Sequence, residues 1–568
     1  MIKGVDYPEW LTEAGLKILR DGYLLEGENV FDMYRRISKA AAVNVKRPDL
    51  EERFYDVLTK NWLCPATPIA ANLGTDRGLP ISCFGIDTPD SIDGIYKTVH
   101  EMAMLSKHGG GVGIGMSRIR GRGAKIKDGK NGVSEGIVPW AKVFDSATIA
   151  TSQGNIRRGA SSVNLHVDHV DIKEFLRIRR QVGDINRQCL NLNQCVVIGD
   201  KFMQRVDSGD KEARRLWIEI LKTRLETGEP YIMFEDTINN TNPQSYKDRG
   251  FKVSMTNICS EITLYTDELH SFVCCLSSLN VARWDEWKDT DLPELAVYFL
   301  DGVISEFINN AKNLPGFERS VRFAEKSRAI GIGVLGWHTL LQSKMIAFDS
   351  FAAMQLNALI FKTIRDKAEK ASRDMAVSYG EPEWCVGSGK RHTHLMAVAP
   401  TRSNSIISGE VSYGIEPIPA NAYVDKTAKG VFLVKNSTFD SLLKSKGQDK
   451  PEVWKSIVTN GGSVQHLEFL TEEEKRVFLT AREINQMALI RQASQRQQFI
   501  DQSQSLNLFF ATNVNPAWFH HVHMEAWKMG IKTLYYCRSS SVLKADSATR
   551  QAEEKPKNIK DECAACEG

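Results

Sequence analysis

Apolar residues recur at helical spacing through the first sixty residues, where Val30, Met33, Tyr34, Ile37 and Ala41 fall on one face of a helix. The same periodicity predicts helices over 93–107, 211–226, 293–311 and 351–378, with Gly or Pro close behind each of them. Short apolar runs at 81–86, 253–258, 270–279 and 394–398 are typical of strands. Strands alternating with helices predict an α/β architecture.

The last 31 residues lack this pattern. Between Arg538 and Glu562 there are eleven charged residues and no aromatic residue. Such a segment buries too little surface to offset its chain entropy, so we expect 538–568 to be a mobile tail. It ends in Cys563-Ala564-Ala565-Cys566. Two thiols at this spacing on a flexible tether can exchange with another disulfide, although a zinc half-site or an inert tail is also open.

Composition narrows the function classes. The 568 residues carry 73 basic and 70 acidic side chains, and this near balance gives no reason to expect binding to nucleic acid or an anionic membrane. No apolar run is long enough for a transmembrane helix, and the N-terminus lacks the apolar core of a signal peptide, so we expect a cytoplasmic protein. Eleven cysteines, an odd number, fit catalytic, redox or buried roles better than a disulfide framework.

Two glycine-rich stretches could be taken for nucleotide-binding motifs. GIGVLG (331–336) matches a dinucleotide fingerprint, but the run before it looks helical, so close backbone packing is the better interpretation. GGGVGIG (109–115) is not a P-loop. It precedes Arg118, Arg120 and Arg122, so a phosphate-binding loop and a solvated basic turn are both open.

The strongest chemical signal is Asn257-Ile258-Cys259-Ser260-Glu261. In an extended segment, residues 257, 259 and 261 project to the same side. An amide, a thiol and a carboxyl then share one pocket, and a buried carboxyl needs a functional reason. A lone cysteine is more often a small buried hydrophobic residue, but these neighbours argue against that.

At this point the chain resembles the large subunits of ribonucleotide reductases, from about residue 60 to the C-terminus. Asn257, Cys259 and Glu261 are similar to the family's finger-loop active site. Cys83 and Cys274 resemble its reducing pair, Tyr535 and Tyr536 its radical-transfer tyrosines, and Cys563 and Cys566 its shuttle cysteines. Cys275 adjoins Cys274. Strand alternation allows only one of them to face the pocket, and the following residues favour Cys274.

The resemblance implies a ten-stranded α/β barrel over 61–537, with the loop that bears Cys259 at its centre. A helical region (1–60) precedes the barrel and the redox tail (538–568) follows it. A thiyl radical on Cys259 would abstract the ribose 3′ hydrogen, with Glu261 as general base and Asn257 hydrogen-bonded to the sugar. Cys83 and Cys274 would supply two electrons, and the tail would reduce them again.

Binding residues are also implied by the resemblance. The substrate-binding set is Thr67, Ser82, Thr401, Arg402, Ser403, Asn404 and Ser405, with Gln153 and Arg157 reading the base. Many relatives have a Glu-Thr-Ser-Ser type turn where this chain has Arg402 to Ser405, which leaves open whether a diphosphate or a triphosphate is the substrate. The effector set, for a nucleoside triphosphate such as dTTP, dATP, dGTP or ATP at a dimer interface, is Asp90, Ser91, Ile95, Arg118, Arg120 and Lys127.

The implied partners are a small (beta) subunit whose metal cofactor generates the radical, a thioredoxin- or glutaredoxin-like reductant, and a second copy of the chain. We expect the chain itself to bind no metal or cofactor. Thr67 comes too early for an ATP-cone before it, which predicts a compact reductase without that overall-activity site. Two other functions remain open: an adenosylcobalamin-dependent reductase, and a nucleotide-regulated thiol–disulfide protein without reductase chemistry.

Overall fold

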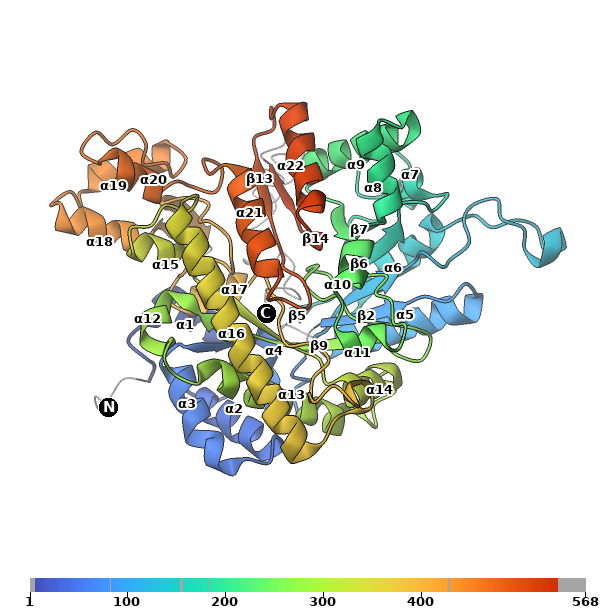
Figure 1. Cartoon of the computed structure of the whole chain (residues 1–568), viewed down its shortest axis with the longest axis horizontal. Coiled ribbons are helices and arrows are strands. Elements are labelled where there is room, and N and C mark those ends of the chain that lie inside the picture. The colour runs from blue at the N-terminus through green and yellow to red at the C-terminus, as the bar shows by residue number, and fades with distance from the viewer. Residues whose placement is uncertain (1–5, 82, 154–156, 182, 428–429, 540–568) are drawn as a thin grey trace.

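The computed structural model describes residues 6–81, 83–153, 157–181, 183–427 and 430–539. Its first helices are α1 (Glu13–Gly22), α2 (Val30–Asn44) and α3 (Glu51–Thr59). A capping box at Asn29 and Asp32 begins α2. Helix α2 packs against α13 (Leu292–Ala311) so closely that a side chain at Gly302 would lie 2.4 Å from the Ala41 carbonyl oxygen. The N-terminal helices therefore form one body with the rest (Figure 1).

The core is a nine-stranded sheet within the described residues. Five parallel strands form one half: β2 (Cys83–Asp87), β3 (Gly111–Gly115), β6 (Ala160–His166), β7 (Leu192–Ile198) and β8 (Tyr231–Phe234). The other strands are β9 (Phe272–Asn280), β10 (Ile330–Leu335), β14 (Thr533–Leu534) and β1 (Leu63–Pro65). β9 runs antiparallel to β2 and parallel to β10, while β14 runs antiparallel to β8.

Two irregular stretches close this sheet into a barrel. Single parallel bridges join Ile332 to Met396 and Val398 to Gln504, and the Tyr535 N–H donates to the Leu506 carbonyl at 2.9 Å. A ring of hydrogen bonds thus runs from β10 through 396–398 and 504–506 to the chain that follows β14. Without β1, the sheet has eight strands. Together with the stretches 396–398 and 504–506, these make the ten strands of the predicted barrel. The predicted α/β barrel is therefore confirmed.

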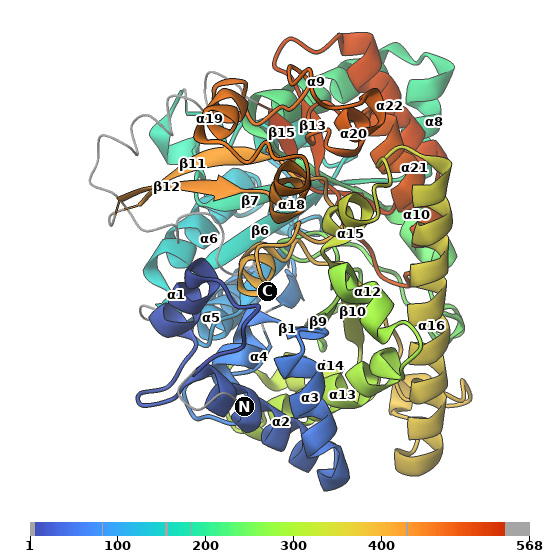
Figure 2. The same ribbon diagram turned by 90° about the vertical axis from the view of Figure 1, so that its left-hand side faces the viewer.

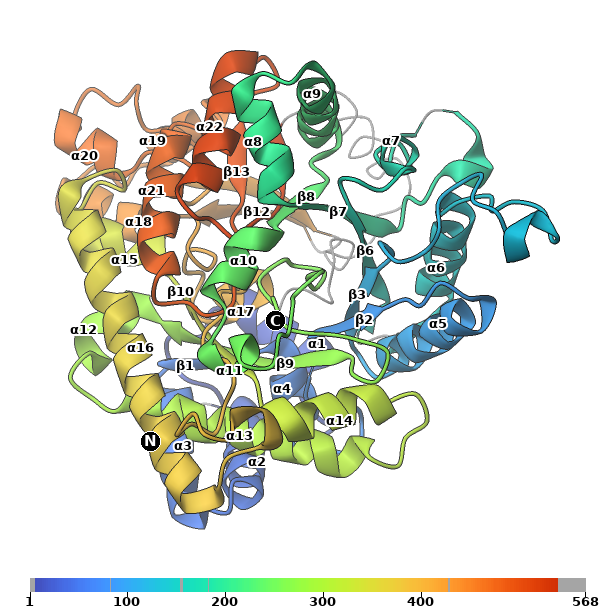
Figure 3. The same ribbon diagram turned by 45° about the vertical axis from the view of Figure 1, so that its right-hand side comes forward.

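The helices cover the outside of the barrel (Figure 3). The helices that carry or adjoin the residues discussed below are α4 (Thr67–Asn72), α5 (Ile92–Lys107), α6 (Val138–Ala150), α9 (Lys211–Thr227), α16 (Phe351–Tyr379), α17 (Arg402–Ile407) and α21 (Gln486–Gln497). The other helices are α7 (Ile172–Phe175), α8 (Asp200–Ser208), α10 (Glu235–Thr241), α11 (Gln244–Lys247), α12 (Trp284–Trp287), α14 (Glu318–Ser327), α15 (Trp337–Ser343), α18 (Ser437–Ser445), α19 (Pro451–Thr459), α20 (Glu472–Val477) and α22 (Pro516–Lys528). The short strands are β4 (Ser152–Gln153), β5 (Arg157–Arg158), β11 (Ala422–Thr427), β12 (Gly430–Lys435), β13 (Leu508–Phe510) and β15 (Cys537–Ser539).

A small second core lies beside the barrel. The hairpin β11–β12 and helices α18 to α20 surround a separate hydrophobic cluster that includes Phe439, Trp454 and Phe478. Figure 2 shows the hairpin next to α19. None of the described helices is both long enough and apolar enough to cross a membrane.

Most elements expected from periodicity are present, with three corrections. The helices α5, α9, α13 and α16 are confirmed, as are strands β2 and β9. The run 253–258 is not a strand, because it belongs to an irregular loop inside the barrel, and 394–398 forms only isolated bridges. The glycines of 111–115 do not open a phosphate loop but form the buried strand β3.

GIGVLG also lies in a strand, and its backbone packs closely against a neighbouring stretch, as the packing interpretation expected. It forms most of β10, and a side chain at Gly333 would lie 2.6 Å from the Ala397 carbonyl oxygen. Its glycines therefore allow the irregular stretch 396–398 to pass close to β10.

Candidate functional site

The loop 251–271 enters the barrel between α11 and β9. Its two ends meet where the rings of Phe251 and Tyr265 stack, with centroids 4.1 Å apart. Further in, Asn164 of β6 exchanges two hydrogen bonds of 3.2 Å with the backbone of Thr256. A side chain at Gly113 would lie 2.2 Å from the Thr256 carbonyl oxygen, so only glycine lets the loop approach β3. The loop is thus anchored to the barrel wall.

The tip of the loop is a turn rather than the extended segment expected from the sequence. The Ser260 N–H donates to the Asn257 carbonyl at 3.2 Å, and Ser260 has a φ of +63°. The Asn257 side chain holds this turn, since its Oδ1 accepts from the Ile262 N–H at 3.1 Å. The grouping of Asn257, Cys259 and Glu261 therefore comes from a turn, and the argument from strand alternation was wrong.

Thiol and carboxyl are brought together at this tip, and both are buried. The Ser505 hydroxyl lies 2.7 Å from the Cys259 carbonyl oxygen and 3.2 Å from Glu261 Oε2. Burial raises the pKa of Glu261 to about 7, although the side chains of Asn257 and Ser505 partly oppose this shift. The Asn257 Nδ2 group makes no full hydrogen bond to any described residue and is a donor that a bound ligand could use.

Cys83 and Cys274 are directly opposite one another where β2 pairs with β9. Opposed residues of an antiparallel pair have side chains on the same face, with Cβ atoms ~5 Å apart, so a small adjustment would join the two thiols. Both side chains are buried. Cys275 points to the other face of β9. Burial raises the pKa of its thiol, Cys83 and Asp301 add to this shift, and Arg328 opposes it. The register thus places Cys274, and not Cys275, opposite Cys83.

Tyr535 and Tyr536 extend the site away from the loop. The Tyr535 hydroxyl lies 3.6 Å from Cys259 Sγ, although 276 positions separate the residues in the chain. The centroids of the two tyrosine rings are 4.4 Å apart, and the Arg538 guanidinium lies over the Tyr536 ring at 4.5 Å. Thiol and phenols therefore form one continuous contact path.

Several residues of this site were not recognised from the sequence. Tyr231 of β8 adds a third ring, with centroids 4.7 Å from Tyr535 and 5.0 Å from Tyr536. Asn193 of β7 donates to the hydroxyls of Tyr231 and Tyr536. Ser505 lies in the run 501–505, Asp-Gln-Ser-Gln-Ser, which is almost entirely buried. Five consecutive polar residues between apolar segments were the available signal.

The expected phosphate turn lies at the start of α17. Thr401 has a φ of +54°, and its hydroxyl accepts from the Gly414 N–H at 2.7 Å. Asn404 Nδ2 donates to the Pro65 carbonyl at 3.0 Å, which brings this turn close to Thr67 at the start of α4. Arg402 and Ser403 are partly exposed, whereas Asn404 and Ser405 are buried. The structure thus brings most of the predicted substrate-binding set together.

The expected effector residues lie beyond the ends of β2 and β3. Arg120 bonds to Asp90 at 2.8 Å, and Arg118 to Asp87 at 3.1 Å. Ser91 caps α5, in which Ile95 is buried. Lys127 is exposed in a short 3₁₀ turn. The two arginines therefore sit among carboxylates at the base of α5.

Some predicted residues lie outside the described part of the chain, namely Ser82, Cys563 and Cys566. Gln153 and Arg157 are paired across β4 and β5, and nothing more is described of them. The five cysteines without an assigned role, Cys64, Cys189, Cys195, Cys385 and Cys537, are all buried. Among the described residues, no group of three or more His, Cys, Asp or Glu side chains is arranged to hold a metal ion.

Two family models match the chain. Residues 9–78 match the ribonucleotide reductase all-alpha domain, and residues 81–213, 210–388 and 383–537 match the ribonucleotide reductase barrel domain. The all-alpha match therefore includes most of the residues before Thr67, the stretch that was expected from the sequence to be too short for an ATP-cone.

Curated relatives and a solved structure agree. The ribonucleoside-diphosphate reductase large subunit of Invertebrate iridescent virus 3 is 35% identical, with 98% of each chain covered. That of Arabidopsis thaliana is 30% identical, covering 95% of this chain and 78% of the relative. The Actinobacillus ureae class Id ribonucleotide reductase alpha subunit superposes with a TM-score of 0.87 at 42% identity, covering 94% of this chain and 99% of that one. With its barrel, its buried thiol loop and these matches, the chain belongs to the class I ribonucleotide reductase large subunits, which reduce ribonucleotides to deoxyribonucleotides.

Proposed function

We propose that this chain reduces ribonucleoside diphosphates by thiyl-radical chemistry started from a separate small subunit. The observation that carries the proposal is the contact of 3.6 Å between the Tyr535 hydroxyl and Cys259 Sγ inside the barrel. A phenoxyl radical at this distance can take the hydrogen atom of the thiol. The path continues through Tyr536, so the radical would enter from that side, where a partner with a metal cofactor would dock.

Glu261 and Asn257 are the proposed acid–base and positioning groups. The thiyl radical would abstract the ribose 3′ hydrogen while Glu261 takes the 3′-hydroxyl proton. A carboxyl with a pKa of about 7 suits this exchange, because it can both accept and return a proton near neutral pH. The Asn257 Nδ2 group is available to hydrogen-bond a sugar hydroxyl.

The opposed thiols Cys83 and Cys274 are the proposed electron source. The 2′-hydroxyl would leave as water, the two thiols would give up two electrons and two protons, and they would become a disulfide. At the end of the cycle Cys259 would return the abstracted hydrogen atom to the 3′ carbon, which regenerates its thiyl radical. Cys563 and Cys566 would then reduce the new disulfide by exchange, and a thioredoxin- or glutaredoxin-like protein would reduce the tail.

Substrate phosphates are proposed to bind between Thr67 and the turn 401–405, and Ser82 belongs to the proposed set by family resemblance alone. Hydroxyl groups and backbone N–H groups at a helix start form a suitable anion site. Gln153 and Arg157 would read the base from the β4–β5 ribbon.

An effector nucleoside triphosphate is proposed to bind at Asp90, Ser91, Ile95, Arg118, Arg120 and Lys127, beside a homodimer interface. Ile92 and Tyr96 of α5 and Ile149 of α6 are more than half exposed, which leaves an apolar face next to these residues. A second copy of the chain that covers this face would bury it and complete the effector site.

The test is conversion of CDP to dCDP by this chain with its cognate small subunit, dithiothreitol and an effector, compared with Cys259→Ser. We expect turnover in the wild type and none in the variant, whose folding is checked by its melting temperature. Turnover that survives the substitution would contradict the thiyl mechanism. Turnover of the chain alone with adenosylcobalamin would favour the cobalamin-dependent alternative, and turnover of CTP only would correct the substrate to a triphosphate.

A further inference from the structure

The buried polar run 501–505 passes beside the proposed reducing pair. Gln502 Nε2 donates to Cys274 Sγ at 3.4 Å and to the Ile330 carbonyl of β10 at 2.9 Å. Its Oε1 is buried and has no hydrogen-bond partner among the described residues. A buried amide that leaves its acceptor unsatisfied, while its donor is directed at a sulfur atom, needs a reason beyond packing.

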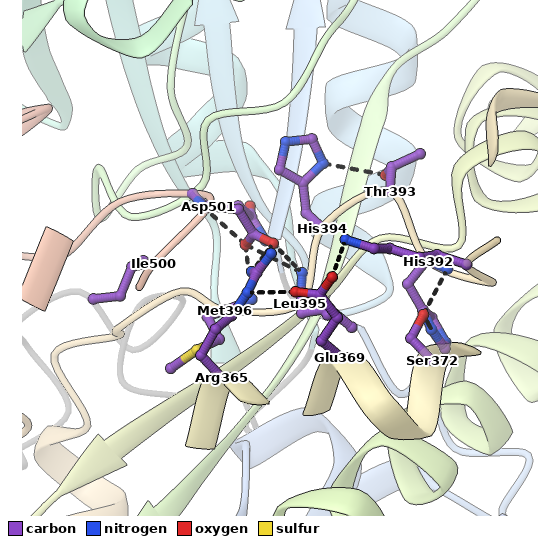
Figure 4. Close-up of polar contacts among 12 residues, drawn as sticks. Arg365, Glu369, Ser372, His392, Thr393, His394, Leu395, Met396, Ile500 and Asp501 are labelled. Atoms are coloured by element: carbon purple, nitrogen blue, oxygen red, sulfur yellow. Dashed lines mark hydrogen bonds and ion pairs between the residues drawn. The ribbon is translucent and has the colours of Figure 1, made fainter. Parts of the chain in front are cut away.

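The backbone that carries Gln502 is held independently of its side chain. The Asp501 carboxylate accepts from the Leu395 and Met396 N–H groups at 2.9 Å and binds Arg365 of α16 (Figure 4). The Lys532 ammonium donates to the Asp501 carbonyl at 2.6 Å. The contacts of Asp501 with Arg365 and Lys532 therefore hold the backbone that places the Gln502 amide beside Cys274. Replacing the Gln502 side chain should leave this backbone in place.

Cys274 is enclosed on the sides away from Cys83. A side chain at Gly331 of β10 would lie 3.4 Å from Cys274 Sγ, and Gln502 covers a further side. Burial raises the pKa of this thiol well above its usual value, and the Gln502 hydrogen bond is the main group that opposes this shift. The nearby Cys83, Cys275 and Glu261 side chains raise the pKa further. Cys83 is also buried, and it is the first residue of β2, at the end of the strand.

We propose that Gln502 is a positioning residue that stabilises the Cys274 sulfur as a thiolate, so that an incoming thiol attacks Cys83 and Cys274 leaves. This inference rests on the proposed role of Cys83 and Cys274 as the pair that is oxidised in each turnover. The identity of the leaving sulfur matters because a thiol leaves faster when its thiolate is better stabilised.

The exchange conserves atoms and electrons. A reductant thiolate attacks Cys83 Sγ and forms a mixed disulfide, while the Cys83–Cys274 bond breaks and its electron pair stays on Cys274. The second thiol of the dithiol reductant then attacks its own partner sulfur, closes a disulfide and releases Cys83. Both cysteines are finally protonated, and the reductant has lost two electrons and two protons.

The experiment uses the full chain with Cys563→Ser and Cys566→Ser, oxidised by one turnover with its small subunit. Reduction of the Cys83–Cys274 disulfide by dithiothreitol is followed by acid quench, alkylation and peptide mass analysis at several pH values. Gln502→Met should slow it ten- to a hundredfold, since a hydrogen bond to a charged group is lost. The matched control is Gln498→Met, because Gln498 is an exposed glutamine on the same stretch of chain. Gln502→Glu is a second variant of nearly native size and should also slow reduction at pH 8.

A monothiol locates the attacked sulfur. With β-mercaptoethanol as the probe, we expect the adduct on Cys83 and a free thiol at Cys274. An adduct on Cys274, or a reduction rate in Gln502→Met equal to that of the Gln498→Met control, would overturn the proposal. If the single turnover oxidises neither cysteine, the proposed reducing pair fails together with this inference, whereas normal oxidation with an unchanged reduction rate rejects Gln502 alone.

Discussion

Two carboxyl groups in this protein are buried to the same degree and behave in opposite ways. Glu261 in the barrel loop is surrounded by neutral groups, makes no ion pair with any described residue, and has a pKa raised to about 7. Asp301 Oδ1 of α13 accepts hydrogen bonds from Arg328 Nε at 2.7 Å, Arg391 Nε at 3.1 Å and His392 Nε2 at 3.2 Å. The two guanidinium groups and the hydrogen bond from His392 hold the pKa of Asp301 far below its usual value.

The difference shows that the type of neighbour, rather than burial alone, separates a structural carboxylate from a reactive one. Asp501 behaves like Asp301, because Arg365 keeps its pKa low in a largely buried place. Where cations surround the carboxylate, charge is stabilised and the group becomes part of the framework. Where only an amide and a hydroxyl surround it, the proton can come and go near neutral pH, which suits proton transfer.

The largest expected effect comes from removing the proton acceptor of the loop. Glu261→Gln keeps size and burial but cannot act as a base, so turnover of CDP should fall by roughly a hundredfold to ten-thousandfold. Steady-state dCDP formation measures this, and an unchanged melting temperature or an increase in it shows that the variant folds. Near-normal turnover would remove Glu261 from the proposed chemistry.

The corresponding change in the framework should affect stability instead. Asp301→Asn leaves Arg328 buried without its counter-charge, and breaking such a buried pair costs about 3–5 kcal/mol. Urea denaturation of the two proteins measures the difference. A variant as stable as the wild type would mean that the cations around Asp301 find other partners and that the comparison with Glu261 is misplaced.

Glu261→Gln should also stabilise the folded chain at high pH. Because the folded pKa of Glu261 is raised from 4.5 to about 7, the wild type loses stability as the pH rises through this window. Above pH 7 the variant should be up to about 3 kcal/mol more stable, and below pH 4.5 the advantage should vanish. Denaturation curves at pH 8 and at pH 5 test this, and a pH-independent difference would exclude titration of Glu261 as its cause.

The smallest effect is the pH profile of the wild-type enzyme. Because the base works only when ionised, turnover should be half-maximal near pH 7 and fall about tenfold for each pH unit below it. The profile is measured under saturating effector and small subunit, with Gln498→Met, a change at an exposed position, as a control that leaves Glu261 in place. A fall in turnover with a midpoint below pH 5 would show that substrate binding or another group controls the rate.

The helices were largely predictable because their signals are local. The apolar spacing of α5, α9, α13 and α16, and the glycines after α9 and α16, are properties of neighbouring residues. The run 253–258 failed for the opposite reason. It is apolar enough for a strand, but contacts with Gly113 and Asn164 hold it as a loop within the barrel.

The sequence alone determined which chemical groups this protein possesses: a thiol between an amide and a carboxyl, further cysteines, paired tyrosines and a cysteine-tipped tail. Only the tertiary structure decided how they meet. Pairing of β2 with β9 selects Cys274 over Cys275, barrel closure brings Tyr535 to Cys259, and three-dimensional neighbours make Glu261 a proton acceptor and Asp301 a fixed charge. The physical reason is that residue type and local periodicity are encoded in short stretches, whereas strand register and electrostatic environment depend on contacts between residues hundreds of positions apart.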